Sequence, residues 1–358
     1  MNIISSNLKN DLKVSPPVII CGMHRSGTSM VSQVLEGCGL YLGNKNDLLS
    51  STQDNPSGYW EFRDLVEFSD QLLESIGASW NEISPLMSKN WLSKIKIEQQ
   101  ISESIRILET LIQVDKPWGW KDPRATILLP FWRCLLPNFK LIVCVRNPLE
   151  VAFSLSKRTI KHVDFQPGLR LWLDYNKLLM RDLENNNALF IHYEQILQNP
   201  NSEIRRLCNF LNLSPTSNDI ANAKNRIQTN LYRGVLSNEL FFQFEYLPPG
   251  ITKMYQELCE KANLNFESLP PKTNTYSQKY LKILEKMLIT STNSFDNFFQ
   301  LLEEQRSSEK TLLINDLKQK ILEKDQEILF YAASKSWKIT RPLRKIQSIF
   351  KINNEKLS

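Results

Sequence analysis

The chain has 358 residues, of which 42% are hydrophobic and 23% are charged, and its formal net charge is +6. These values are typical of globular proteins and exclude a disordered, a collagen-like or a disulfide-scaffold chain. At about 150 residues per domain, the length predicts one large domain with an appendage, or two domains. The six cysteines contain no Cys-x-x-Cys pair, which favours buried free thiols in a reducing compartment.

Residues 1–16 form a polar lead-in without the apolar core of a signal peptide. The longest apolar runs, Val18–Cys21 and Leu141–Val145, have the length of strands and are too short to span a bilayer. We therefore expect a cytoplasmic protein.

Apolar runs alternate with segments of helical periodicity over the first 213 residues. Strands are expected over Val18–Cys21, Trp118–Lys121, Leu141–Val145 and Leu189–Ile191. Helices are expected over Thr28–Leu35, Trp60–Ile76, Trp91–Ile112, Ala125–Leu136, Leu149–Arg158, Leu169–Leu183 and Ser202–Leu211. This alternation predicts an α/β fold of three layers, in which a parallel sheet has helices on both faces.

Beyond Pro270 and Pro271, proline and glycine nearly disappear, which predicts a helical segment over 271–330. Apolar residues there fit heptad a and d positions for about two heptads, but Lys324 interrupts the series. The pattern indicates a weak coiled coil. It is compatible with a homodimer formed through 280–329 and with a solvated surface helix.

Residues 331–358 form a basic tail. Its segment Lys335–Lys351 carries six lysines or arginines and no acid, so the rest of the chain has no net charge. Trp337 and Phe350 lie among these cations. The tail is either a solvated end or an interfacial segment for anionic lipid or polysaccharide, at the inner face of the membrane. Nothing in it indicates a module that reads nucleic-acid bases.

A glycine-containing loop follows the first expected strand and opens a helix. Gly22-Met-His-Arg-Ser-Gly-Thr-Ser29 has the spacing of a Walker A loop, whose backbone N–H groups surround an anion. Thr28 replaces the lysine of kinases and ATPases, and Arg25 supplies a cation that can clamp an oxyanion. A later strand ends in Arg146, where nucleotide triphosphatases have a magnesium-binding aspartate. This pattern predicts a phosphate-rich ligand held by amides and cations, without a metal.

The order of motifs from about Pro17 to Leu213 resembles the sulfotransferases that use 3′-phosphoadenosine 5′-phosphosulfate (PAPS). The glycine loop resembles that family's 5′-phosphosulfate loop. Arg146 with Ser154 eight residues later resembles its 3′-phosphate motif. Lys121-Asp-Pro-Arg124 is similar to a motif of the tyrosylprotein branch.

Two further segments add to the resemblance. Ile191-His-Tyr193-Glu matches a strand end near the nucleotide, and Asn55-Pro-Ser-Gly-Tyr-Trp-Glu61 is similar to a motif of bacterial and polysaccharide-associated relatives. The resemblance predicts a sulfotransferase domain over residues 17–270, with a fold like that of P-loop nucleotide triphosphatases.

The resemblance implies transfer of a sulfuryl group from PAPS to a hydroxyl or amine by in-line displacement. The residues implied in donor binding are Gly22, His24, Arg25, Ser26, Gly27, Thr28, Ser29, Arg146, Ser154, Arg158, Tyr193 and Arg233. Arg25 would hold the 5′-phosphate and the bridging oxygen, and Lys121 would neutralise the sulfuryl oxygens. Arg146, Ser154 and Arg158 would bind the 3′-phosphate.

An acceptor hydroxyl also needs a base. Glu61 is the candidate, with Asp64 one turn further on and His24 in the glycine loop as rivals. His162 and His192 are expected to be structural or surface residues.

Trp118 and Trp120 are expected in the core or in a pocket wall, with adenine stacking as the alternative.

Two other functions of the chain stay open. One is a P-loop phosphotransferase, which the missing Walker lysine and strand-end aspartate disfavour. The other is a non-catalytic nucleotide- or glycan-binding module on a coiled-coil stalk. A glycan is the expected acceptor, because the tail resembles those of bacterial glycan-modifying enzymes.

Overall fold

The computed structural model describes residues 15–52, 55, 58–112, 116–136, 138–158, 162–183, 188–227, 241, 247–264 and 319. The chain divides into two compact units, Met1–Ile289 and Thr290–Ser358, and only residue 319 of the described residues belongs to the second. The expectations for the coiled-coil positions, the basic tail and Arg233 lie outside the described residues.

Four parallel strands form one sheet in the order β2-β1-β3-β4. The strands are β1 (Val18–Cys21), β2 (Gly119–Lys121), β3 (Lys140–Val145) and β4 (Ala188–His192). Val18 pairs with Gly119 on one side and with Lys140 on the other, and Leu141 pairs with Ala188. Each strand lies within one residue of its expected bounds.

Helices connect the strands and flank the sheet. The α-helices are α2 (Thr28–Gly37), α3 (Arg63–Glu74), α4 (Ile97–Leu111), α5 (Leu129–Leu135), α6 (Pro148–Ser156), α7 (Phe165–Asp182), α8 (Tyr193–Gln198), α9 (Pro200–Leu211), α10 (Ser217–Asn225) and α12 (Ile251–Lys261). The 3₁₀ helices are η1 (Lys45–Asp47), η2 (Ser84–Met87), η3 (Trp91–Lys94) and η4 (Pro123–Thr126).

Three expected helices are shorter or divided. The one expected from Trp60 begins at Arg63, because Trp60 has a left-handed backbone with φ of 59° and Phe62 is extended. The one expected over 91–112 consists of η3 and α4, separated at Ile95, which is also extended. The one expected over 125–136 is divided between η4 and α5. Pro130, in the first turn of α5, cannot donate to a helix that continues from η4.

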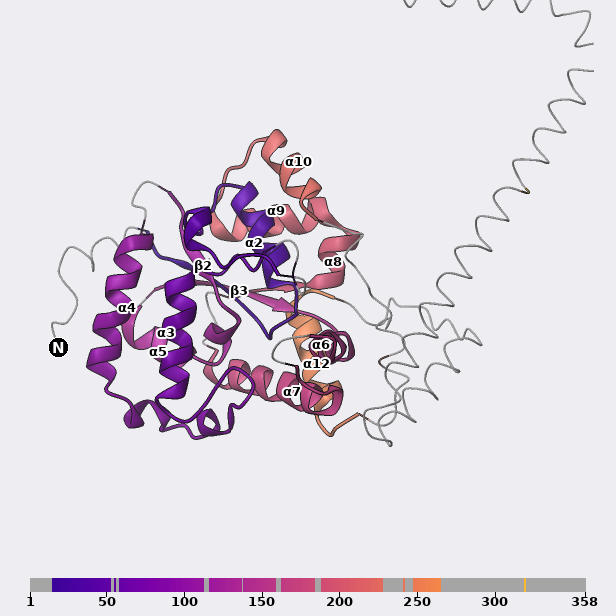
Figure 1. Cartoon of the computed structure of the whole chain (residues 1–358). Coiled ribbons are helices and arrows are strands. Elements are labelled where there is room, and N and C mark those ends of the chain that lie inside the picture. The colour runs from indigo at the N-terminus through magenta and orange to yellow at the C-terminus, as the bar shows by residue number, and fades with distance from the viewer. Residues whose placement is uncertain are drawn as a thin grey trace, which may run out of the picture. The chain divides into compact units, whose positions relative to one another are not determined.

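Helices cover both faces of the sheet, which confirms the predicted three-layer α/β architecture (Figure 1). On one face, α2, α9 and α10 pack over strand residues of a shared apolar cluster, among them Ile20, Ile142 and Ile191. On the other face, α12 contacts β4 and α7. Tyr255 of α12 is fully buried there, with its ring 6.0 Å from that of Trp172.

The tryptophans at β2 belong to the core. Trp118 and Trp120 are both fully buried, and the ring of Trp120 lies 4.9 Å from that of Trp132 on α5. They are therefore core residues, and burial leaves no face for an adenine ring.

All six cysteines are free, and five of them are buried as expected. Cys134 differs, because it is exposed on α5. Within the described part of the chain, no helix combines the length and the apolar character that crossing a membrane requires.

Candidate functional site

The predicted donor-binding residues that the structure describes meet at one edge of the sheet. The four strands are parallel, so their carboxyl ends lie together. There, β1 leads into Gly22, β2 ends in Lys121, β3 leads into Arg146 and β4 is followed by Tyr193. The next strand along the chain, β2, lies on one side of β1, and the following strand, β3, lies on its other side. The glycine loop after β1 therefore lies at the switch point of the strand order, where open α/β sheets bind ligands.

Two glycines allow the loop to pass close to its neighbours. Gly22 has φ of 129°, and a side chain on it would collide with the Cys144 carbonyl on β3. Its N–H donates to Thr126 Oγ1 at 2.8 Å. Gly27 has φ of 91°, and a side chain there would collide with the Tyr193 ring. No described side chain caps α2, which begins at Thr28, so its first amides face a potential anion.

The two predicted phosphate motifs contact each other directly. Arg25, with φ of 69°, donates from Nε to Ser154 Oγ at 2.8 Å. Arg146 donates from Nη1 to the Arg25 carbonyl at 3.0 Å. The loop after β1 and the motif after β3 therefore form one continuous site.

Arg146 is held from two further sides. Its Nη2 pairs with Glu150 Oε2 at 2.9 Å, one turn along α6. Its guanidinium lies 4.4 Å from the centre of the Tyr193 ring. Tyr193 thus packs between Gly27 and Arg146, which gives it a structural part in the site whether or not it contacts a ligand.

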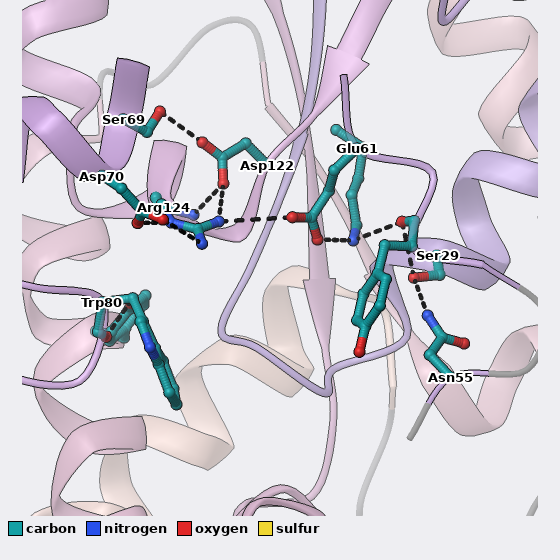
Figure 2. A network of polar contacts seen from close by, with 11 residues as sticks. Ser29, Asn55, Glu61, Ser69, Asp70, Trp80, Asp122 and Arg124 are labelled. Carbon is teal, nitrogen blue, oxygen red and sulfur yellow. Dashed lines mark hydrogen bonds and ion pairs between the residues drawn. The ribbon is translucent and has the colours of Figure 1, made fainter. Parts of the chain in front are cut away.

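Glu61 and Lys121 form a buried ion pair, which Figure 2 shows. The Lys121 ammonium donates to Glu61 Oε1 at 2.6 Å and to the Tyr59 carbonyl at 2.9 Å. The same carbonyl accepts a hydrogen bond from Ser29 Oγ at 3.1 Å. The predicted base and the predicted sulfuryl-binding cation are therefore in contact with each other and linked to the first turn of α2.

Arg124 is the centre of a larger network (Figure 2). It bonds both oxygens of Asp70, at 2.5 and 3.2 Å, and Asp122 Oδ1 at 3.1 Å. It also lies 3.5 Å from Glu61 Oε2. Ser69 Oγ donates to the other oxygen of Asp122 at 2.7 Å. Burial lowers the pKa of Arg124, but the three surrounding carboxylates outweigh burial and hold its pKa above the ordinary value.

His24 lies in an aromatic and cationic environment. Its ring centre is 4.7 Å from that of Trp80 and 6.0 Å from that of Tyr175. Its buried Nε2 has no hydrogen-bond partner among the described residues. Burial, followed by the charges of Arg124, Arg158, Lys121 and Arg25, lowers its pKa well below the ordinary value, so the imidazole is neutral at pH 7.

Trp80 and Tyr175 belong to this environment, although no sequence motif indicated them. The Tyr175 hydroxyl donates to the Trp80 carbonyl at 2.6 Å, and the Arg158 guanidinium lies 5.3 Å from the Trp80 ring centre. Asp70 was missed as well, and Arg124 was noted only as the last residue of the Lys121–Arg124 motif, without a role. Nothing local in the sequence could have indicated these contacts, because they join residues far apart in the chain.

The remaining candidates lie elsewhere or have structural partners. Asp64 is exposed on α3. His162 pairs with Asp164 at the surface, at 2.8 Å. His192 is buried: its Nδ1 accepts from the Glu194 amide at the start of α8, and its Nε2 lies 2.9 Å from the Tyr255 hydroxyl. Both histidines thus have the structural or surface roles expected of them.

Two other features bear on ligands. A cavity of about 720 Å³ lies beside the start of α9, and none of the glycine-loop residues lines it. Its lining residues are Leu197, Gln198, Asn199, Pro200, Asn201, Ser202, Lys224, Asn225 and Ile227. Across the residues that the structure describes, no three histidines, cysteines or acids lie close enough together to hold a metal ion.

Comparison with known proteins identifies the family of the chain. The family model described as "Sulfotransferase family" matches residues 16–217. A relative from Caenorhabditis elegans, named "Putative protein-tyrosine sulfotransferase", is 31% identical over 100 residues, 26% of this chain and 39% of the relative. One of the same name from Caenorhabditis briggsae is 30% identical over 100 residues, 26% of this chain and 36% of the relative. The chain thus spans less than two fifths of the length of these relatives.

Solved structures are similar at lower identity. The sulfotransferase STF9 from Mycobacterium avium is 14% identical, with a TM-score of 0.45, over 74% of this chain and 81% of that one. The family model alone covers more than half of the present sequence. The chain therefore belongs to the sulfotransferase family.

Proposed function

We propose that the chain transfers a sulfuryl group from PAPS to a hydroxyl or amine acceptor without a metal. The observation that carries the proposal is the direct contact between the two phosphate motifs, through the Arg25–Ser154 and Arg146–Arg25 hydrogen bonds. A ligand with phosphate groups at both ends of its ribose would bridge these motifs. PAPS has a 3′-phosphate and ATP does not, so this geometry favours PAPS.

The donor's 5′ end would lie at the glycine loop. The amides of Gly27 and Thr28 would surround its phosphosulfate at the start of α2. The Ser26 amide and the Ser29 hydroxyl, which donate to the Met23 and Tyr59 carbonyls, would exchange these partners for the ligand. Arg25 would neutralise the bridging oxygen, where charge grows as the nucleotide leaves. Arg146, Ser154 and Arg158 would hold the 3′-phosphate, and Arg233 is a further proposed contact.

Lys121 would stabilise the transferred group. In the reaction the acceptor oxygen bonds to sulfur while the bond between sulfur and the bridging oxygen breaks, and 3′,5′-adenosine bisphosphate (PAP) leaves. The Lys121 ammonium is buried and donates to the Tyr59 carbonyl, which also accepts a hydrogen bond from the Ser29 hydroxyl. A buried cation at that position would stabilise negative charge on the sulfuryl oxygens more strongly than an exposed one.

Glu61 is the proposed base for the acceptor proton. Its carboxylate is buried and contacts Lys121 and Arg124, which fix its position beside the proposed sulfuryl-binding cation. Asp64 is exposed, and His24 is neutral with an available ring nitrogen, so both stay rivals that mutagenesis must separate from Glu61.

We propose a glycan hydroxyl as the acceptor. The support is the similarity of the Asn55–Glu61 segment and of the basic tail to polysaccharide-associated enzymes. The nematode relatives are named for protein tyrosine, so a tyrosine hydroxyl is the competing class. A cytoplasmic location, contact of 335–351 with a membrane or polyanion, and dimerisation through 280–329 are proposed on the sequence alone.

Calorimetry tests the donor. The chain should bind PAP tightly, and ATP with magnesium weakly. Removal of the 3′-phosphate from the ligand should cost most of the affinity, and Arg25→Ala and Arg146→Ala should each weaken PAP binding. Preference for ATP would favour the phosphotransferase alternative and overturn this proposal.

The acceptor class can be found with labelled PAPS. The full chain is incubated separately with extracted polysaccharides, lipids and proteins, and the labelled fraction is identified. Label in polysaccharide supports the glycan proposal, whereas label confined to protein tyrosine replaces it. Tight PAP binding without label in any fraction favours the non-catalytic alternative.

A further inference from the structure

Trp80 lies outside every motif that predicts the donor site, yet two residues of that site contact its ring. The ring of His24, in the glycine loop, packs against it with centres 4.7 Å apart. The guanidinium of Arg158, just beyond α6, lies 5.3 Å from its centre. Trp80 thus contacts both the 5′ loop and the end of the proposed 3′-phosphate motif.

Trp80 is itself fixed in place. It is 4% exposed, and the Tyr175 hydroxyl of α7 donates to its carbonyl at 2.6 Å (Figure 2). Tyr175 is also fully buried, so the anchor and the indole ring are both part of the packed interior. A side chain held in this way can orient a neighbour without losing further conformational freedom.

Arg158 is a residue that needs such orientation. Arginine has many rotamers, and Arg158 lies two residues beyond Ser156, the last residue of α6. Ser154, in the last turn of α6, bonds to Arg25. A cation over the face of an indole is attracted to the ring, so Trp80 restricts the guanidinium of Arg158 to one region.

The neutral state of His24 fits this arrangement. Arg158 is one of the cations that oppose protonation of His24. A charged imidazole against the same indole would repel Arg158. A neutral one packs beside it and fills the space between Trp80 and Tyr175.

We propose that Trp80 is a positioning residue for the donor's 3′-phosphate and acts by holding Arg158 toward it. This inference rests on the proposed function, because it requires a nucleotide with a 3′-phosphate. It assigns a role in donor selection to the segment between α3 and η2, which carries no phosphate-binding motif.

Two ligands that differ only in the 3′-phosphate measure the contribution of that group to affinity. Calorimetry with the full chain measures PAP and adenosine 5′-phosphate (AMP), which lacks the 3′ group. We expect Trp80→Leu to lower PAP affinity about tenfold and to leave AMP affinity unchanged. Trp80→Phe, which keeps an aromatic face, should lower PAP affinity less than Trp80→Leu does. Trp132→Phe is the matched control: it alters a buried tryptophan of the core and should leave the ratio of PAP to AMP affinity unchanged.

A double-mutant cycle tests whether Trp80 acts through Arg158. In an Arg158→Ala background, Trp80→Leu should cause no further loss of PAP affinity. An equal loss for PAP and AMP, or the same loss with and without Arg158, overturns the inference. If Trp80→Leu does not fold, Trp80→Met, which also removes the aromatic face, completes the cycle. A wild-type chain that binds PAP no better than AMP overturns the proposed function as well, so the two failures are distinguishable.

Discussion

Glu61 is a carboxylate shared by two buried cations. Lys121 is 2.6 Å from one of its oxygens and Arg124 is 3.5 Å from the other. Removal of the charge alone is therefore more informative than removal of the side chain. Glutamine has the same shape and keeps an oxygen that accepts from Lys121, but it cannot take a proton from an acceptor.

Glu61→Gln should lower turnover by about 10²–10⁴-fold, the usual contribution of a general base, while PAP affinity stays unchanged. Single-turnover transfer from labelled PAPS measures the first quantity and calorimetry the second. Asp64→Asn is the matched control, since Asp64 is exposed in the first turn of α3. Full turnover in Glu61→Gln would remove Glu61 as the base, and a loss in Asp64→Asn would assign the role to Asp64.

His24 should stay neutral throughout the neutral pH range. Burial and four nearby cations lower its pKa, so protonation is expected only well below the ordinary value. The chain has only three histidines, and His24→Gln identifies the His24 signal in imidazole NMR spectra by difference. We expect no shift of that signal between about pH 8 and pH 6. A midpoint at or above the ordinary pKa would contradict the neutral state.

Single residues at strand ends were predictable, and their distant partners were not. Arg25, Lys121 and Arg146 each follow an apolar run, and parallel strands necessarily bring such positions together. The contacts Arg124–Asp70 and Trp80–His24 join residues more than 50 positions apart. No spacing or composition indicates such a contact, because the packing of α3 and its following loop creates it.

At the scale of elements, the strands were easier to predict than the helices. The central strands β1 and β3 are short runs buried by helices on both faces, which leaves a continuous apolar signal. Helix bounds depend on backbone details that periodicity does not carry. The apolar spacing continues through Trp60 and through Pro130. However, α3 begins only after the left-handed backbone at Trp60, and α5 begins at Leu129, because Pro130 has no N–H group to continue the preceding 3₁₀ helix.

Close approach of the loop to α8 predicts a strict requirement at Gly27. Gly27→Ala would place a methyl group in the Tyr193 ring, whereas Gly39→Ala, at a similar φ of 98°, would meet no atom within 4 Å. Gly39→Ala should therefore cost about 1 kcal/mol of unfolding free energy, from backbone strain alone. Gly27→Ala should cost more and also weaken PAP binding. Urea unfolding and calorimetry check both, and equal losses in the two variants would contradict the packing argument.

At the scale of the whole molecule, the folded unit extends beyond the part that the family model matches. The family match ends at residue 217, yet α12, at Ile251–Lys261, packs on β4 and α7. Tyr255 makes this contact specific through its hydroxyl, which lies 2.9 Å from His192 Nε2. His192 also accepts a hydrogen bond from the Glu194 amide in the first turn of α8. It therefore connects the end of β4, beside the candidate site, to α12.

Acid should weaken this connection. Burial, and to a smaller extent Arg146, lowers the pKa of His192 from 6.5 to about 3 in the folded chain. As pH falls below about 6.5, the unfolded chain gains a proton at His192 that the folded chain does not, so stability decreases with falling pH until about pH 3. Between pH 7 and pH 5 the expected loss from this residue is about 2 kcal/mol.

Urea unfolding of the wild type and of His192→Gln at both pH values measures that contribution, because other titrating groups cancel in the difference. The wild type should lose about 2 kcal/mol more than His192→Gln between pH 7 and pH 5. Equal losses in the wild type and His192→Gln would show that His192 takes up its proton without breaking the contact between β4 and α12. Any loss of unfolding free energy at low pH would then come from titrating groups other than His192.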